Sequence, residues 1–459
     1  MSTPLRPYPE YRDSGVDWLS QVPAHWDVVR NGRLFAERNE TGFPDLPILE
    51  VSLRTGVRVR DMEGGRKQQM ADRTKYKRAA KGDVAYNIMR MWQGAVGIAP
   101  CDGLVSPAYV VARPLDGVEP RFYTYLFRTR AYMREVDFAS RGIVPDRNRL
   151  YWQYFKPLMS PFPPPEEQRR IADFLDSYTA QVQRLIVAKR RTIAALVERK
   201  QAIIEGLLGA GGGLASKSIR HPVVGDMPEH WRVSRLKDWC DVNARTLAEG
   251  TSRDYTFDYF DISVVGTGVL TGEPEAMTFG AAPSRARRQL APNDILISTV
   301  RTYLKAIYFF EDWPRDAIAS TGFAVLSPKA GVIPELLAYA LMTPRFIDLV
   351  ISRSVGVAYP AIAETRLSAL HLALPIDENE QELILSKIKA DTKLVDEAVA
   401  KERGQIDLII EYRDSIIAAV VTGELDVRAA DITVVEGEDL AEDTATDDED
   451  QEGELDAVD

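Results

Sequence analysis

The spacing of apolar residues along the chain predicts two long amphipathic helices. Between 165 and 209, and again between 377 and 422, apolar residues recur every three to four positions. Acidic residues open each run and glycine closes it, at Gly209 and Gly423. Each helix would be roughly 65 Å long. An antiparallel pair would bury both apolar stripes, and the alternative is that each helix folds back on its own domain.

Shorter apolar runs, several of them rich in β-branched residues, precede each helix and predict strands. The first set lies at 48–60, 83–89, 94–99 and 105–112, and the second lies at 260–270, 294–300, 305–310 and 322–326. One further helix is predicted after each set, at 120–136 and at 334–352. Strands and helices arranged in this way indicate an α+β fold.

The chain repeats these features in the same order, which indicates an internal duplication. Val22-Pro-Ala-His-Trp corresponds to Met227-Pro-Glu-His-Trp, Gly82-Asp-Val-Ala-Tyr to Asn293-Asp-Ile-Leu-Ile, and Glu167-Gln168 to Glu380-Gln381. We therefore predict two tandem-repeated mixed α/β domains separated by two long antiparallel, coiled-coil-like helices, with pseudo-twofold symmetry. The boundaries are 1–160 and 214–373 for the domains, 165–209 and 377–422 for the helices, and 424–459 for a tail.

The net charge of −11 is unevenly distributed along the chain. The tail from Glu424 to Asp459 has 16 acidic residues and one basic residue, so it carries −15 and leaves +4 on residues 1–423. Between Arg54 and Arg90 the net charge is +7. This composition predicts a disordered acidic tail and a mildly basic folded part, which suits a polyanionic partner.

The sequence carries no recognisable catalytic or metal-binding motif. Cys101 and Cys240 lack a nearby cysteine partner, which argues against a zinc site and favours a reducing cytoplasm. The four histidines show no metal-ligand spacing, and no phosphate-binding GxxxxGK motif is present. Val265-Gly-Thr-Gly-Val-Leu-Thr-Gly272 has the wrong glycine spacing for a dinucleotide loop and suggests a strand and turn. The sequence contains no run of about 18 apolar residues, so it predicts no membrane-spanning helix.

Two similar domains held apart by paired helices would present related surfaces to duplex DNA, whose backbone has twofold symmetry. Arginine can bond to guanine through two atoms, asparagine and glutamine can do the same to adenine, and lysine suits phosphates. The candidate DNA-binding residues are Arg90, Trp92, Gln93, Arg141, Arg147, Asn148, Thr299, Arg301, Tyr303, Lys305, Arg353 and Tyr359. The candidate phosphate contacts are Arg66, Lys67, Lys75, Arg285 and Arg287.

Several motifs resemble those of one protein family. They are Tyr11-Arg-Asp-Ser-Gly-Val-Asp-Trp-Leu with Val22-Pro-Ala-His-Trp, Asp294-Ile-Leu-Ile-Ser-Thr-Val-Arg-Thr-Tyr-Leu-Lys, and the helix starts Pro-Pro-Pro-Glu-Glu-Gln and Pro-Ile-Asp-Glu-Asn-Glu-Gln. Together they resemble the specificity subunits of type I restriction–modification enzymes. The resemblance covers residues 7 to about 423.

The resemblance implies a DNA-binding subunit whose two target-recognition domains read the halves of a split, asymmetric sequence. The two helices would form a spacer that docks two adenine methyltransferase subunits, and two motor–nuclease subunits would join for cleavage. This chain would hold no cofactor, and S-adenosylmethionine, ATP and Mg would bind in partner subunits. The complex would be a type I site-specific deoxyribonuclease and adenine-specific DNA methyltransferase, whereas this chain would be non-catalytic.

Two other interpretations stay open at this point. The chain could serve a two-part restriction–methylation enzyme of another type, because its specificity subunit would have a similar sequence. It could also be a helical scaffold without DNA contact, although the basic loops argue against this. The long acidic tail departs from the family pattern, and we hypothesise that it weakens non-specific DNA binding by competing for the basic face.

Overall fold

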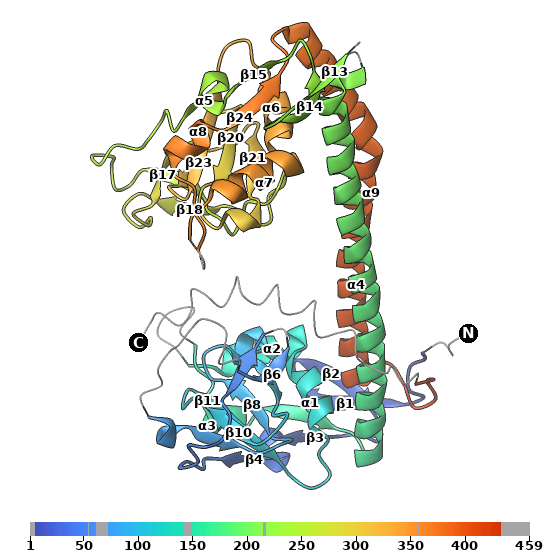
Figure 1. Ribbon diagram of the computed structural model, residues 1–459. Helices are drawn as coiled ribbons and strands as arrows, with labels where there is room; N and C mark the ends of the chain where they lie inside the picture. The colour runs from blue at the N-terminus through green and yellow to red at the C-terminus, as the bar shows by residue number, and fades with distance from the viewer. Residues whose placement is uncertain are drawn as a thin grey trace. The chain divides into compact units, whose positions relative to one another are not determined.

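The computed structural model of this protein describes residues 5–53, 55–60, 72–141, 148–213, 217–356 and 359–432. Contacts between residues divide the chain into two compact units. Unit 1 comprises Met1–Ala188 and Gln405–Thr444, and unit 2 comprises Lys189–Gly404 and Ala445–Asp459. Each unit therefore contains one repeat together with parts of both long helices (Figure 1).

Unit 1 contains a four-stranded antiparallel sheet at its centre. Its strands, in spatial order, are β4 (Phe35–Arg38), β11 (Tyr109–Pro114), β8 (Val84–Asn87) and β9 (Val96–Ile98). Two antiparallel strand pairs accompany this sheet, the hairpin of β5 (Leu49–Ser52) with β6 (Gly56–Val59) and the pair of β7 (Lys77–Ala79) with β10 (Gly103–Val105). A parallel bridge between Ile48 and Leu104 connects the two pairs. The predicted alternation over 48–60 is thus a hairpin that turns before Gly56.

Unit 2 repeats this topology, with its outer strands joined into a second four-stranded sheet. Its first sheet has the order β16 (Cys240–Val242), β23 (Phe323–Pro328), β20 (Asp294–Ser298) and β21 (Ile307–Phe310). Its second sheet has the order β18 (Glu275–Thr278), β17 (Thr256–Phe260), β22 (Ala317–Ser320) and β19 (Ala286–Gln289). The strands β17 and β22 pair in parallel, as Ile48 and Leu104 do in unit 1. The prediction of a duplicated α+β fold is confirmed.

The helix that follows the strands is broken in both units, which corrects the prediction of one helix per repeat. Unit 1 has α1 (Pro120–Phe127) and α2 (Arg130–Ala139), and unit 2 has α6 (Pro334–Leu341) and α7 (Pro344–Arg353). The second helix begins after a threonine in each case. The Thr129 side chain accepts a hydrogen bond from the Tyr132 amide, and the Thr343 side chain accepts one from the Phe346 amide. An N-cap of this kind starts a new helix although the apolar spacing continues.

Short elements surround these sheets in corresponding positions. In unit 1, β1 (Tyr11–Val16) pairs with β2 (Leu19–Pro23), β3 (Asp27–Arg30) pairs with β12 (Met159–Phe162), and α3 spans Trp152–Phe155. In unit 2, β13 (Ser218–His221) pairs with β14 (Gly225–Pro228), and β15 (Arg232–Arg235) pairs with β24 (His371–Leu374). The short helices α5 (Leu236–Trp239) and α8 (Glu364–Ser368) complete unit 2.

The two long helices are α4 (Pro165–Gly209) and α9 (Glu378–Val421). In unit 1, Ile171 near the start of α4 shares a hydrophobic cluster with Val420 near the end of α9. In unit 2, Ile204 near the end of α4 shares a cluster with Ile384 near the start of α9. The helices therefore pair in antiparallel orientation within each unit, which confirms the predicted pair over separate folding back.

A buried carboxylate anchors the first turn of each long helix to its own unit. Glu167 of α4 is 7% exposed and lies 2.8 Å from the His25 ring nitrogen Nε2. It also accepts hydrogen bonds from the Trp26 indole at 3.1 Å and the Tyr8 hydroxyl at 2.6 Å. All three residues precede Glu167 by more than 140 positions. The anchor therefore connects the N-terminal segment to α4.

Unit 2 has a matching anchor with fewer donors. Glu380 of α9 accepts hydrogen bonds from the Trp231 indole at 2.9 Å and lies 2.9 Å from Nε2 of His230. The side-chain amide of the next residue, Gln381, donates a hydrogen bond to the Gly331 carbonyl. Its side-chain oxygen accepts one from the backbone amide of Ile333. Gln168 makes equivalent bonds in unit 1. The repeated His-Trp and Glu-Gln motifs are thus structural.

The repeated Gly82-Asp83 and Asn293-Asp294 motifs also have one structural explanation. Gly82 and Asn293 adopt positive φ angles of 91° and 72°. The following aspartates are buried, and each accepts a hydrogen bond from the amide three residues earlier. Arg38 at the end of β4 pairs with Asp83, and Arg245, which follows β16, pairs with Asp294. A buried charge requires a partner of opposite charge. The motif and its arginine therefore determine how β8 and β20 begin.

The start of the predicted tail is folded, which corrects the expectation that all of 424–459 is disordered. Val427 is fully buried in the core of unit 1 and Ala430 is 7% exposed. The Asp426 amide donates to the carbonyl of Arg6 at 2.7 Å, and the Arg428 guanidinium lies over the Tyr8 ring. Composition alone misses this segment because its few apolar residues are dispersed among acidic ones. Residues 433–459 lie outside the described part of the chain.

Within the described residues, no helix is both long and apolar enough to cross a membrane. Cys101 and Cys240 are both free thiols.

Candidate nucleic-acid interface

The candidate DNA-binding residues of unit 2 lie on the loop between β20 and β21. This loop contains the short 3-10 turn η5 (Thr302–Leu304), which Arg301 precedes and Lys305 follows. Both flanking residues have left-handed backbone conformations, with φ of 50° and 55°. Such conformations are uncommon for residues with a Cβ atom and persist only where surrounding contacts hold them.

A second region, made of residues 354–356 and 359–362, holds η5 from one side. The Thr302 and Ser354 hydroxyls lie 2.8 Å apart, and the Ile362 amide donates to the Thr299 carbonyl at 2.9 Å. The Arg301 guanidinium lies 5.1 Å from the centre of the Tyr359 ring, within cation–π range. Arg353 is exposed at the end of α7, directly before Ser354. The structure therefore brings the unit 2 candidates together from two separate segments.

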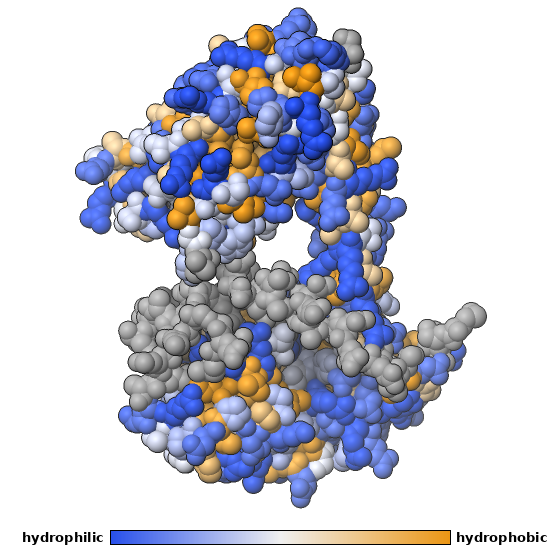
Figure 2. Space-filling view, in the orientation of Figure 1, coloured by the Kyte–Doolittle hydropathy of each residue, from blue (hydrophilic) through white to orange (hydrophobic). Residues whose placement is uncertain are grey.

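The surface of these two loops combines cations with apolar side chains. Tyr303 is 49% exposed and Tyr359 is 66% exposed. Leu304 and Val355, which sequence reasoning did not single out, are 40% and 63% exposed. Figure 2 shows apolar side chains interspersed with polar ones on the visible face of the molecule. Apolar groups beside arginine suit a base edge, because thymine presents a methyl group in the major groove.

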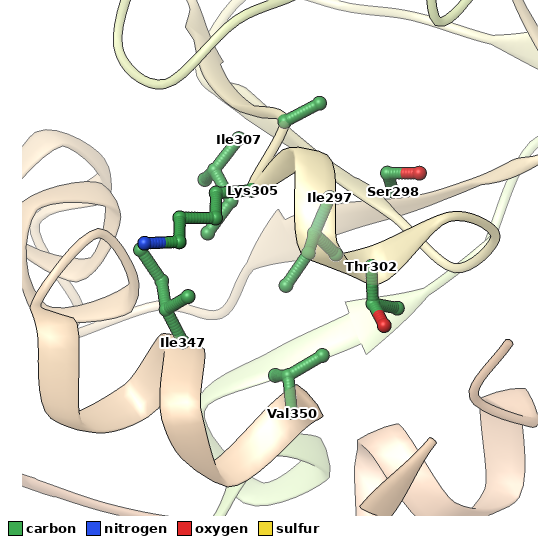
Figure 3. A pocket seen from close by; sticks show the side chains of 8 residues that line it. Ile297, Ser298, Thr302, Lys305, Ile307, Ile347 and Val350 are labelled. Carbon is green, nitrogen blue, oxygen red and sulfur yellow. The ribbon is translucent and has the colours of Figure 1, made fainter. Parts of the chain in front are cut away.

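The Lys305 side chain lies beside a very small cavity (Figure 3). The cavity has a volume of about 10 Å³, which is at most the space for one water molecule. Its lining includes Lys305, Ile307 of β21, and Ile347 and Val350 of α7. The lysine stem thus covers apolar surface while the residue as a whole is exposed, a common arrangement for lysine.

The candidate residues of unit 1 lie on the equivalent loop between β8 and β9. Arg90 precedes the 3-10 turn η3 (Met91–Gln93), and Gly94 follows it with φ of 90°. The Leu150 amide donates to the Ile88 carbonyl at 2.8 Å, which places the chain after residue 148 beside this loop. Gln93 is exposed and Arg90 is half-buried.

Neighbouring candidates in unit 1 have partners within the protein. The Arg141 guanidinium lies 5.7 Å from the Tyr154 ring centre. The Trp92 indole donates to the Met89 carbonyl, and the Asn148 amide donates to the Asp137 carboxylate at 2.8 Å. The latter two side chains therefore stabilise the loop in this conformation. Arg147 lies outside the described residues.

Sequence reasoning missed Phe138 in this region. Phe138 is 87% exposed on the last turn of α2, next to the Asp137 that binds Asn148. The prediction ended this helix at 136, which left Phe138 outside any element. A large apolar residue directly after the charged Asp137 would have been the available signal.

The candidate phosphate contacts are divided between the two units. Lys75 is exposed and lies 3.8 Å from Asp72, and Arg285 is exposed just before β19. Arg287 is half-buried with its guanidinium 4.7 Å from the Phe279 ring centre. Arg66 and Lys67 lie outside the described residues.

Part of the basic segment of unit 1 is used inside the protein. Arg78 pairs with Asp102 at 2.7 Å and with Glu40 at 3.1 Å. The Lys77 ammonium donates to the Tyr109 carbonyl, and burial lowers the pKa of Lys77. The local charge of this segment therefore overstates the number of cations available to a ligand. No group of three potential metal ligands occurs among the described residues.

Comparisons with known proteins find similar sequences. Residues 228–405 match the family described as the type I restriction modification DNA specificity domain. The putative MjaX specificity subunit of Methanocaldococcus jannaschii is 22% identical over 89% of this chain and 96% of its own length. The HindI specificity subunit of Haemophilus influenzae is 24% identical over 32% of this chain and 34% of its own length.

Two solved structures are also similar. A chain from a type I R-M system has 20% identity and a TM-score of 0.49, and covers 88% of this chain and 99% of that one. The HsdS subunit from Thermoanaerobacter tengcongensis has 21% identity and a TM-score of 0.34, covering 88% and 98%.

Residues 228–405, which include most of unit 2, are thus similar to a type I restriction modification DNA specificity domain. The motifs noted in the sequence likewise resemble those of type I specificity subunits, and the MjaX subunit is similar to this chain over most of its length.

Proposed function

We propose that this chain selects the DNA target of a type I restriction–modification complex by reading two half-sites, one with each unit. The observation that carries the proposal is the position of two arginines. Arg90 and Arg301 each directly precede a 3-10 turn between equivalent strands of the central sheet. An arginine beside a turn can reach a guanine edge in the major groove, and two divergent loops would read different bases.

In this proposal the recognition domains are residues 1–160 and 214–373. The helical segments 165–209 and 377–422 act as the spacer that separates the half-sites. The remaining candidates on each loop contact neighbouring bases, and Lys75, Arg285 and Arg287 contact phosphates. Residues 424–432 belong to the folded part of unit 1, where Val427 and Ala430 complete its hydrophobic core.

The test is to express the chain with an adenine methyltransferase subunit and to map N6-methyladenine across the host genome. We expect one split, asymmetric motif with a gap of fixed length. A stable complex that methylates no defined motif would contradict the proposal and favour a scaffold role. A motif without any associated cleavage activity would leave target selection intact and favour a methylation-only or two-part system.

We also propose that the long helices dock methyltransferase subunits through exposed apolar side chains. In unit 2, Leu383 and Leu394 of α9 are 50% and 75% exposed. They are eleven residues apart, which is about three turns, so both lie on one helix face. In unit 1, Leu408 and Tyr412 are 66% and 64% exposed and four residues apart. Exposed apolar side chains grouped in this way are typical of protein interfaces.

This docking proposal predicts that Leu394→Glu weakens binding of the methyltransferase about tenfold or more, because it places a charge in an apolar interface. Gln181→Glu is the matched control, since Gln181 is exposed at the corresponding position of α4. Titration calorimetry with purified methyltransferase measures both affinities. Equal affinities for wild type and Leu394→Glu would contradict the proposal.

In the assembled complex, the motor–nuclease subunits would join this core, and S-adenosylmethionine, ATP and Mg would be bound by the partner subunits. The role of this chain is to bind the target DNA and position it for the partner subunits.

A further inference from the structure

The connection between β17 and β18 in unit 2 is much longer than the equivalent connection in unit 1. Fourteen residues, 261–274, separate β17 from β18, whereas three residues, 53–55, separate the equivalent β5 and β6. We call residues 264–271 of this connection the glycine-rich loop. It corrects the prediction of a strand over 260–270, because the strand ends at Phe260 and the chain then turns. The pairing of Val265 with Leu270 closes the loop on itself.

The glycine-rich loop packs against the junction between η5 and β21. The Gly268 amide donates to the Ile307 carbonyl at 2.7 Å, and the Ile307 amide donates to the Gly266 carbonyl at 3.1 Å. The Thr267 hydroxyl donates to the Lys305 carbonyl at 2.5 Å. Val265 is 3% exposed and shares a hydrophobic cluster with Ala306. The loop therefore restrains the three consecutive residues from 305 to 307.

Lys305 needs such a restraint because of its backbone conformation. Its φ of 55° and ψ of 30° lie in the left-handed region, which glycine adopts freely and lysine does not. The residue after the turn in unit 1 is Gly94, with φ of 90°. Unit 1 thus ends its turn with glycine. Unit 2 ends the equivalent turn with a cationic side chain and supplies an outside hydrogen bond to the strained residue.

We infer that Thr267 is a positioning residue for recognition of the second half-site, because it holds Lys305 and η5 in the conformation that contacts DNA. The inference rests on the proposed function of the η5 loop. Without the hydroxyl, residue 305 is free to return to the right-handed region. That rotation would redirect the lysine ammonium and move the neighbouring Tyr303, while the backbone pairing of Ile307 keeps the unit folded.

The test uses the complex of this chain with its methyltransferase. Thr267→Val removes the hydroxyl at nearly constant volume, and Thr267→Ser retains it. We measure methylation rates on the target and on duplexes with one base changed in either half. Thr267→Val is expected to reduce discrimination in the second half about three- to tenfold, which corresponds to one lost hydrogen bond. Discrimination in the first half stays unchanged, and Thr267→Ser behaves as wild type.

A double variant separates positioning from a general effect on folding. In Lys305→Gly the strained residue is replaced, so adding Thr267→Val is expected to change discrimination no further. Equal discrimination by wild type and Thr267→Val, with Arg301→Ala impaired in the second half, would overturn the inference and leave the proposed function standing. Loss in both halves with a lower unfolding temperature would also overturn it. If wild type itself shows no half-site discrimination, the proposed function fails.

Discussion

Unit 1 and unit 2 share one topology but differ in how firmly each holds its long helix. Glu167 in unit 1 receives three side-chain donors, from Tyr8, His25 and Trp26. Among the described residues, Glu380 in unit 2 receives the two that correspond to His25 and Trp26. Unit 1 also packs the segment after α9 against Tyr8, including the buried Val427. The His-Trp and Glu-Gln motifs therefore provide the same anchor in both units. In unit 1, contacts from Tyr8 and from the segment after α9 are added to it.

The candidate recognition loops differ more than the sheets that carry them. The central sheets have the same strand order, and Arg90 and Arg301 have the same place in it. Around these arginines, however, the turn ends with Gly94 in one unit and Lys305 in the other. The connection next to the turn has three residues in unit 1 and fourteen in unit 2. Divergence limited to loops is what two readers of different sequences require.

The largest expected effect concerns the two anchors. Glu167→Ala leaves the Tyr8 hydroxyl and the Trp26 indole buried without their acceptor, so we expect it to lower the free energy of unfolding by roughly 3 kcal/mol. Glu380→Ala should lower it by only about 1–2 kcal/mol, because Glu380 is more exposed and binds fewer donors. Chemical denaturation monitored by tryptophan fluorescence measures both values.

Two controls make this comparison specific. Glu167→Gln keeps an acceptor oxygen and should lose much less stability than Glu167→Ala. Glu166→Ala changes an exposed carboxylate in the same helical turn and should cost at most about 0.5 kcal/mol. Equal losses for Glu167→Ala and Glu380→Ala would show that the additional contacts of unit 1 contribute nothing.

An intermediate effect is expected where the two recognition turns end. Gly94→Ala should destabilise unit 1 by about 1–2 kcal/mol, because it forces a Cβ atom into the left-handed region. The added atom would also lie 3.1 Å from the Met133 sulfur. Lys305→Gly should leave stability unchanged or raise it by up to about 1 kcal/mol, since it relieves the same strain. Thermal unfolding of the two variants should thus shift in different directions, and parallel shifts would be inconsistent with this explanation.

The smallest expected effect separates the two thiols. Cys240 in unit 2 is fully buried, and burial raises the pKa of its thiol to about 12. At pH 8 only about one molecule in ten thousand then carries the reactive thiolate. Cys101 in unit 1 is half-buried. An alkylating reagent followed by mass spectrometry should therefore modify Cys101 at least about a hundredfold faster. Similar rates at both thiols would mean that unit 2 opens readily.

The sequence predicts the regular and repeated parts of this fold. The long helices are predictable because their apolar spacing persists for more than forty residues and proline and glycine mark their ends. The duplication is visible because motifs such as His-Trp and Glu-Gln recur in order. Their physical role becomes clear only in three dimensions, where His25 and Glu167 meet across 142 positions of sequence.

The parts that sequence reasoning missed depend on tertiary contacts. The break after Arg128 requires the Thr129 cap, although the apolar spacing of a single helix continues across it. Val427 is buried because Arg6 and Tyr8 meet the segment that follows α9, and an acidic composition hides this. For the candidate site, the sequence indicates the Arg90 and Arg301 loops. It does not show that Trp92 and Asn148 bind groups within their own unit.

The central claim is that each unit reads its own half of one DNA target. It is tested most directly by measuring methylation by the complex on duplexes with single base changes, for Arg90→Ala and for Arg301→Ala. We predict that each variant loses about 5- to 150-fold discrimination in one half of the target, a different half for each variant, and retains the other half. If both variants lose discrimination in the same half, or if neither loses any, the division of target reading between the two units is wrong.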